Sequence, residues 1–169
     1  MESNIEDNKT EDPIFVTTEE KERETTIATR DLVMKVLKEI GCEPIEDDEI
    51  KLHFIYQGET FGIDTHNDYL FINIYDLWWY EIPMNDNIDE FARMQKAINF
   101  TNTIGTCTVL YSINEQEGVI GVSSKNTLLF TSQIPELDIY LLSILDGFFK
   151  TKQNVMMEME KYKVREEQL

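Results

Sequence analysis

The segment Tyr69–Ile82, which reads YLFINIYDLWWYEI, is the most hydrophobic run in the chain and contains both tryptophans. Apolar side chains recur in it at every second position, which is typical of a strand packed on a core. The intervening positions are also mainly apolar, whereas an antiparallel strand with one solvated face alternates more cleanly. We therefore predict a central strand covered on both faces, the second cover being a helix, a second subunit or a bound chain.

The period of two divides this strand into two faces. We expect the core-facing side chains to be Leu70, Ile72, Ile74, Trp78, Tyr80 and Ile82, and the opposite ones to be Tyr69, Phe71, Tyr75, Leu77 and Trp79. Asp76 interrupts the core-facing set just before Trp78. A β-bulge at this point would exchange the directions of the two tryptophans.

Shorter strands are predicted before this segment. Ile50–Tyr56 alternates apolar and polar residues, and Thr60–Asp64 returns after a turn at Gly58. The sequence His-Asn-Asp at 66–68 predicts a second turn, because Asn and Asp bond locally and tolerate left-handed backbone. Consecutive strands joined by tight turns pair antiparallel, so we expect a meander that ends in the central strand.

Helices are predicted where apolar residues recur every three or four positions. The first spans about Thr26 to Ile40 and is followed by Gly41, a residue typical of helix C-termini. The second begins after cap candidates at 85–87 and ends at Gly105.

The last helix begins near Pro135, a residue favoured in a first helical turn. Its apolar stripe continues to Tyr162 and is interrupted only by Lys152. We interpret Leu137–Phe149 as an ordinary helix lying on the sheet. The methionine-rich stretch Val155–Tyr162 would overrun a small sheet, so it either meets another surface or frays.

A hairpin is predicted between the second and last helices, with strands at Cys107–Ile113 and Val119–Ser123. Leu128–Phe130 is either a continuation of the second strand past a bulge or a separate short strand. The predicted fold is α+β, a single antiparallel sheet of about five strands in the order α-β-β-β-α-β-β-α with helices packed on the sheet.

The charge of the chain narrows the classes of partner. Its 169 residues include 15 Lys and Arg against 33 Asp and Glu, a net charge of −18. A field of this sign repels phosphate backbones and anionic lipid, so we expect neither nucleic acid nor membrane as a partner. It would attract basic polypeptide segments.

Residues 1–24 are acidic and poor in hydrophobic side chains, so we expect a flexible leader followed by a single domain over residues 25–165. The start of the chain lacks the basic and then apolar pattern of a signal peptide. No stretch approaches the roughly 18 apolar residues that span a bilayer. The only cysteines, Cys42 and Cys107, are too sparse for a disulfide framework. These features predict a cytoplasmic protein.

Candidate chemistry is sparse. Asp64, His66 and Asp68 could each ligate a metal, but they lack the glycine and distal glutamate of a calcium loop. A turn accounts for these three residues more simply than a metal site does. Glycine patterns that bind nucleotides are absent, and Cys107 lies in an apolar strand, as inert structural cysteines do. We therefore predict no catalytic residues, no metal and no cofactor.

The middle helix ends in the sequence AINFTNT, in which Asn99 and Asn102 form an N-x-x-N pair. Asn is a poor residue inside helices, so we expect this pair to form hydrogen bonds near the helix end. The hairpin VLYSINEQEGVIGV follows. With the order of elements over about residues 26–162, these segments resemble the YbjN-like family of bacterial sensory transduction regulators and the wider type III secretion chaperone fold.

The resemblance implies a small cytoplasmic protein that works by protein binding and not as an enzyme. Similar chaperones are acidic homodimers that hold an extended segment of a client protein against the sheet and helices. The candidate partner-binding residues are the aromatic residues Phe71, Tyr75, Trp78 and Trp79 of the central strand and Phe148, Phe149, Met156 and Met157 of the last helix.

Two other classes of function are open at this point. An immunity or inhibitor protein would use its acidic surface to neutralise a basic toxin or nuclease through salt-sensitive binding. A small metal-dependent hydrolase would use the residues around His66, and purified protein would then contain stoichiometric metal.

Overall fold

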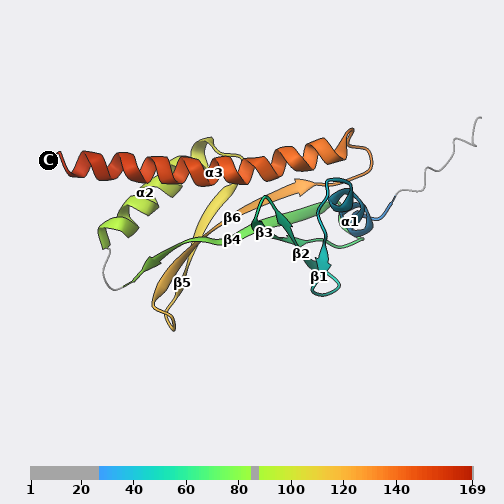
Figure 1. Ribbon diagram of the computed structural model, residues 1–169, viewed down its shortest axis with the longest axis horizontal. Coiled ribbons are helices and arrows are strands. Elements are labelled where there is room, and N and C mark those ends of the chain that lie inside the picture. Colours follow the sequence, from blue (N-terminus) through green and yellow to red (C-terminus); the bar gives the residue numbers. More distant parts are fainter. Residues whose placement is uncertain (1–26, 85–87, 169) are drawn as a thin grey trace, which may run out of the picture.

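The computed structural model describes residues 27–84 and 88–168. The elements in chain order are α1 (Thr29–Glu39), β1 (Ile45–Glu46), β2 (Lys51–Tyr56), β3 (Glu59–Asp64), β4 (Phe71–Pro83), α2 (Ile88–Ile104), β5 (Thr108–Asn114), β6 (Val119–Leu129) and α3 (Leu137–Glu166). The fold is α+β, as predicted (Figure 1). The predicted leader over 1–24 and the cap candidates at 85–87 lie outside the described residues.

All six strands belong to a single antiparallel sheet in the order β1-β2-β3-β4-β6-β5. The predicted number of about five strands was wrong because β1, a two-residue strand directly after Pro44, was not recognised. The predicted meander is confirmed as β2, β3 and β4. Of the alternatives for residues 128–130, continuation is correct, since β6 reaches Leu129, which lies opposite Phe71 of β4.

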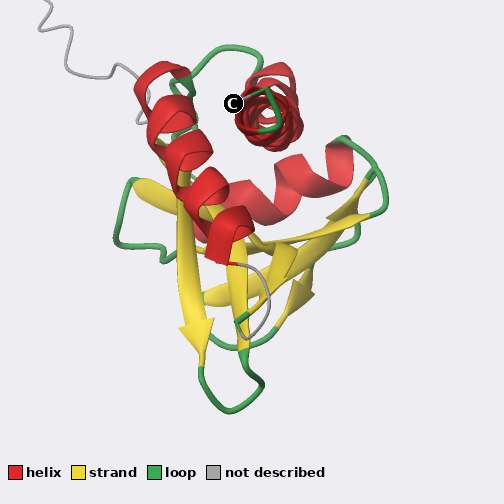
Figure 2. Ribbon diagram, turned by 90° about the vertical axis from the view of Figure 1, so that its left-hand side faces the viewer, coloured by secondary structure: helices red, strands yellow, loops and turns green. Residues whose placement is uncertain are grey.

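All three helices cover the same face of the sheet (Figures 1 and 2). β4 is central, as predicted, because it pairs with β3 on one side and β6 on the other. Its second face, however, is not covered by any helix of residues 27–84 and 88–168. Phe71 and Leu77 on that face are 61% and 58% exposed. Of the three alternatives for the second cover, a helix is therefore wrong for the described residues.

One hydrophobic cluster fills the space between α1, the first half of α3 and the sheet from β2 to the first part of β4. Phe61 lies at its centre, stacked on Phe54 at 5.6 Å between ring centroids and edge-on to Phe148 at 5.4 Å. All three rings are fully buried. Burial of one such ring contributes about 1.5–3 kcal/mol relative to exposure, so this cluster fixes α3 on the sheet.

A second hydrophobic cluster joins α2 and the later part of α3 to the other end of the sheet. Val155 and Met159 of α3 are buried in it, against Met94 and Ile98 of α2 and Ile82 of β4. This contact settles the question about Val155–Tyr162: the stretch meets the protein's own α2. β4 and β6 extend the sheet beneath both clusters, so the buried side chains of α3 follow it as far as Met159.

A charged pair connects the sheet to α3 in the interior. Asp76 of β4 is 1% exposed, and its Oδ2 lies 2.8 Å from Nζ of Lys152 on α3. Glu59 of β3 adds a second carboxylate 3.3 Å from the same ammonium group. Burial raises the pKa of the Asp76 carboxyl, while its hydrogen bond and charge interaction with Lys152 lower it. Asp76 interrupts the apolar period predicted for the central strand, and Lys152 interrupts the apolar stripe predicted for the last helix. These two residues thus form an ion pair with each other.

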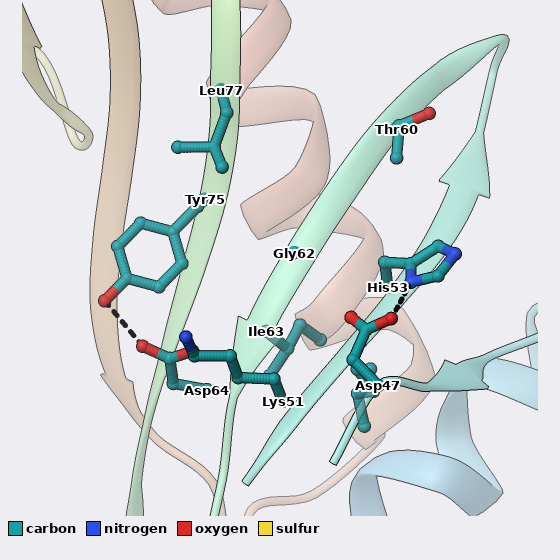
Figure 3. A pocket seen from close by; sticks show the side chains of 10 residues that line it. Asp47, Lys51, His53, Thr60, Gly62, Ile63, Asp64, Tyr75 and Leu77 are labelled. Carbon is teal, nitrogen blue, oxygen red and sulfur yellow. Dashed lines mark hydrogen bonds and ion pairs between the residues drawn. The ribbon is translucent and has the colours of Figure 1, made fainter.

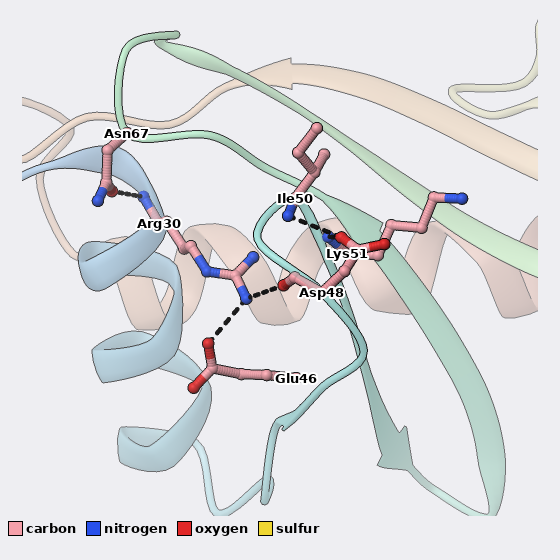
Figure 4. Close-up of polar contacts among 6 residues, drawn as sticks. All are labelled: Arg30, Glu46, Asp48, Ile50, Lys51 and Asn67. Atoms are coloured by element: carbon pink, nitrogen blue, oxygen red, sulfur yellow. Dashed lines mark hydrogen bonds and ion pairs between the residues drawn. The ribbon is translucent and has the colours of Figure 1, made fainter.

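Helix α1 is attached through its first turn (Figure 4). The backbone N–H of Arg30 donates to Oδ1 of Asn67 at 2.8 Å, so the loop between β3 and β4 caps the helix. The Arg30 guanidinium donates to Oε2 of Glu46 and to the carbonyl of Asp48, both at 2.8 Å. The Asp48 carboxylate accepts from the backbone N–H groups of Lys51 and Ile50, which lower its pKa.

The charged pair predicts how stability changes when Lys152 is removed. Lys152→Met leaves Asp76 as an uncompensated buried carboxylate, which we expect to lower the free energy of unfolding by about 3–5 kcal/mol at pH 7. Asp76→Asn combined with Lys152→Met should lower it by less, because neither charge remains. Urea unfolding of the three proteins measures both effects.

The same variant has a predicted pH dependence. Loss of Lys152 removes the interaction that lowers the Asp76 pKa, so the folded-state value lies further above the unfolded value of about 3.9. The folded state then binds more protons than the unfolded state between these values, and stability falls as pH rises through that window. The deficit of Lys152→Met should therefore shrink when pH is lowered from 7 to 5. A pH-independent deficit would contradict this account.

Candidate functional site

The sheet face turned away from the helices, called the open face below, carries exposed apolar side chains. Strand alternation and register place Ile55, Phe71, Leu77, Leu110 and Leu129 on it, all of them exposed. Phe71 and Leu129 lie directly opposite each other on neighbouring strands. Groups of exposed apolar side chains on one face mark interaction surfaces in soluble proteins. The open face is therefore the candidate site.

The open face is hollowed where β2, β3 and β4 lie side by side (Figure 3). The hollow has a volume of about 440 Å³. Gly62 of β3 forms its floor, and a Cβ atom at this position would have no atom within 4 Å. Tyr75 and Leu77 of β4 line one side, and His53 of β2 lines the other. The absence of a side chain at Gly62 is thus what leaves the space open.

Polar groups are fixed around this hollow. The Tyr75 hydroxyl donates to Oδ2 of Asp64 at 2.9 Å, and Nδ1 of His53 lies 2.8 Å from Oδ1 of Asp47. Burial, followed by the interaction with Asp64, raises the pKa of Tyr75 to about 12, so its hydroxyl stays protonated at neutral pH. Nζ of Lys125 on β6 lies over the Tyr75 ring, 5.4 Å from its centroid. The hollow can therefore present an apolar wall with hydrogen-bonding groups at its rim.

No metal site is formed by these side chains. Within residues 27–84 and 88–168, no three His, Cys, Asp or Glu side chains are close enough to hold a metal ion. His66 instead accepts a hydrogen bond from the backbone N–H of Asp68 at 3.1 Å, as a residue in a turn does. The arrangement on the open face is suited to contact with another molecule through its apolar and hydrogen-bonding groups.

β4 contains a bulge next to the hollow. Its pairing with β6 runs to Asp76 opposite Ser124 and resumes with Tyr80 opposite Val122, so β4 has two extra residues. Trp78 lies in this bulge with a φ of 55°, and its backbone N–H donates to Oγ of Ser123 at 3.0 Å. The left-handed backbone turns the Trp78 ring onto the open face.

The Trp78 ring lies against Gly121 of β6. A Cβ atom at Gly121 would be only 2.6 Å from ring atoms Cδ2 and Cε3, so no larger residue fits without moving the ring. Gly121 shares the open face with Glu81 of β4 and Ser112 of β5, which lie opposite it on either side. The tryptophan is therefore seated flat on the sheet and half-buried.

Trp79 has the opposite direction. Its Nε1 donates to Oγ of Ser124 at 3.0 Å, and its ring lies 5.9 Å from Nζ of Lys152 beneath α3. The prediction that Trp78 faces the core and Trp79 faces outward was wrong, because the bulge interrupts the two-residue period between Asp76 and Tyr80. The alternative of a bulge at this position, which exchanges the directions of the two tryptophans, is the one that the structure contains.

The structure distributes the predicted partner-binding residues over three places. Phe71, Tyr75 and Trp78 share the open face, whereas Trp79 belongs to the interior. Phe148 is fully buried, and Phe149 is half-buried against Phe61 and Tyr56 at 6.0 and 6.1 Å between ring centroids. Met156 and Met157 are exposed on α3, on the helical side of the molecule. The eight residues therefore do not form one surface.

The predicted role of the asparagine pair is confirmed for one member. The side-chain amide of Asn102 donates from Nδ2 to the carbonyl of Val109 at 3.0 Å, and its Oδ1 accepts from the Val109 N–H at 2.8 Å. This pair of bonds ties the end of α2 to β5. Asn99 is exposed on the preceding turn.

Sequence reasoning missed Gly62, Lys125 and Leu129. Gly62 interrupts an otherwise ordinary strand pattern. A glycine inside a strand often marks a place where a ligand or another chain segment can approach the sheet backbone closely. Lys125 and Leu129 were not assigned because the extent of β6 was left open. Their position beside Tyr75 and Phe71 depends on the pairing of β4 with β6.

Comparison with known proteins identifies the fold without a function. No family model and no curated protein matches the chain. The structure is similar to the crystal structure of an uncharacterized protein from Methanothermobacter thermautotrophicus, with a TM-score of 0.57 and 14% sequence identity. The match covers 79% of this chain and 98% of the other. At this level of identity the likeness concerns the fold alone.

The seat of Trp78 can be tested with two glycine substitutions. Gly121→Ala places a methyl group inside the Trp78 ring, so we expect a loss of about 1–3 kcal/mol in the free energy of unfolding and a shift in tryptophan fluorescence. Gly62→Ala is the matched control in a neighbouring strand, where the new methyl group meets nothing. It should be neutral or slightly stabilising. Equal losses for the two variants in urea unfolding would show that Trp78 does not occupy this position.

Proposed function

We propose that the protein is a non-enzymatic binding or regulatory domain, similar to a chaperone, that holds a polypeptide partner on the open face. The observation that supports this most is the group of exposed apolar side chains on the open face of the described domain, of which Phe71 and Leu77 are the most exposed in β4. Covering them with a partner removes apolar area from water, which favours association.

The hollow supports a polypeptide as the partner. Its volume of about 440 Å³ accommodates a side chain, with the apolar wall of Tyr75 and Leu77 and the polar groups of Asp64 and His53 around it. Pockets that take individual side chains give specificity in the recognition of extended peptides. Gly62 at the floor would allow the partner's side chain to approach the sheet backbone.

The resemblance to YbjN-like regulators and secretion chaperones is the ground for proposing further that the protein is a cytoplasmic homodimer. Cys42 and Cys107 are both buried and free, which suits a reducing compartment. None of the described helices α1, α2 and α3 is both long and apolar enough to cross a membrane.

The alternative of an acidic inhibitor rests on the negative charge of the chain and not on its exposed apolar side chains. The end of β1 and the turn after it contain the consecutive acidic residues 46–49, Glu-Asp-Asp-Glu, and the whole chain carries a charge of −18. The open face carries charges of both signs, since Lys51 lies opposite Asp64, and Lys125 of β6 and Glu81 of β4 lie elsewhere on it. A partner held there should bind with little dependence on salt, whereas neutralisation of a basic protein should weaken steeply as salt increases.

Substitution of Phe71 tests the proposal. Phe71→Asp places a charge beside Leu129 on the open face without affecting the core, and it should reduce recovery of a specific partner from native extract by at least about tenfold. Quantitative mass spectrometry of co-purified proteins measures this recovery, followed by titration with the purified partner.

Met157→Asp is the matched control, since Met157 is similarly exposed but lies on α3. It should bind as the wild type does. Binding lost with Met157→Asp and kept with Phe71→Asp would place the partner on α3 and contradict the proposal. Equal retention by both variants, with steep salt dependence, would favour the acidic inhibitor.

A further inference from the structure

The two edges of the sheet differ in length and chemistry. β1 has two residues and is flanked by Pro44 and Asp47, features that prevent further strand pairing. β5 has seven residues, TVLYSIN, and in the described chain only β6 pairs with it. It contains no charged residue, although 28% of the chain is charged. A long edge strand without Lys, Glu or Pro lacks the usual protection against pairing with another strand.

Asn102 determines which part of this edge is available. Its amide bonds both the N–H and the C=O of Val109, so these groups point away from β6. Outward-pointing backbone groups recur at every second residue of an antiparallel strand. Those of Tyr111 and Ile113 therefore also point away from β6. The Asn102 amide takes the place of a neighbouring strand at Val109, which leaves Tyr111 and Ile113 as the available positions.

The side chains along this part of β5 are exposed and held in place. Ile113 is 53% exposed, and Leu110 and Tyr111 are 39% exposed each. The Tyr111 ring packs edge-on against Phe91 of α2 at 5.1 Å, and its hydroxyl accepts from Nε2 of Gln95 at 3.1 Å. The hairpin of β5 and β6 projects away from the helices (Figures 1 and 2), so the edge is accessible near its tip.

We propose that β5 pairs antiparallel with β5 of a second copy, so that the sheet continues across a two-fold axis. Two chains that each carry a charge of −18 repel one another, and the uncharged strand is where they can approach at least electrostatic cost. A two-fold contact brings the same surface together from both copies, and antiparallel strands satisfy this requirement. This inference rests on the proposed homodimer and assigns its interface to β5 rather than the open face.

The available backbone groups fix the register. An axis through Ser112 pairs Tyr111 of each copy with Ile113 of its partner, so both available positions are used. An axis at Tyr111 would require Val109, whose groups are occupied by Asn102. An axis at Ile113 would pair Tyr111 with a residue in the turn after Asn114. Ser112 therefore lies opposite Ser112 of the second copy, and Tyr111 packs beside an isoleucine, a favourable cross-strand pair.

Charge substitutions at Ser112 test both the interface and the register. Ser112→Glu places two carboxylates opposite each other, and Ser112→Lys places two ammonium groups there. Each variant alone should dimerise at least about tenfold more weakly than the wild type, because like charges directly opposite repel. An equimolar mixture of the two variants should form a heterodimer of at least wild-type affinity. Analytical ultracentrifugation measures all four samples, and recovery in the mixture shows that both variants are folded.

Thr60→Glu is the matched control, since Thr60 is exposed on the open face but lies in β3, within the sheet. It should dimerise as the wild type does. Hydrogen exchange should show protection of the Tyr111 and Ile113 amides that increases with protein concentration.

A wild-type chain that sediments as a monomer, whether or not another polypeptide then binds β5, would overturn the proposed homodimer and this interface together. A wild-type dimer that Ser112→Glu does not weaken would overturn the β5 interface alone. Neither result affects the test of partner binding with Phe71→Asp, so failure of the two proposals can be distinguished.

Discussion

The contact between Asp76 and Lys152 determines how the sheet and its longest helix fit together. A carboxylate this deeply buried requires a cation, so α3 must cross β4 where Lys152 can reach it. The crossing lies between the two hydrophobic clusters, each of which uses a different half of α3. The bulge begins immediately after Asp76 and sends Trp78 to the open face and Trp79 toward Lys152. The buried Asp76 thus sets the position of α3, and the bulge in β4 begins directly after it.

Local patterns in the sequence predicted the elements because each depends on nearby residues. The central strand, the meander, the hairpin and all three helices followed from apolar periods and turn residues. Asp76 and Lys152 were both visible as interruptions of apolar patterns, but nothing local indicates that residues so far apart in the sequence are partners. The directions of the tryptophans were wrong for a related reason. A two-residue period holds only while pairing is regular, and Trp78 adopts a left-handed backbone that the pattern cannot show.

The candidate site could be predicted only in part. Phe71 and Tyr75 were assigned to the correct face because they precede the bulge. The hollow was not predicted, since it depends on Gly62 lying between His53 and Tyr75 on adjacent strands, and this requires the register of three strands. Aromatic residues of α3 were grouped with the site because their helical stripe does not say which members are buried. Their burial follows from how α3 is seated on the sheet, a tertiary property.

The position of α3 in the chain has a consequence for folding during synthesis. Both hydrophobic clusters are closed by α3, yet α3 follows every strand in the sequence. A nascent chain that has completed β6 therefore presents the apolar faces of β4 and β6 to water until the 30 residues of α3 have left the ribosome. Such intermediates aggregate readily. Long-range contacts between the helix and early strands also raise the contact order and slow folding. The arrangement that makes the finished domain cooperative leaves its unfinished form dependent on the last helix.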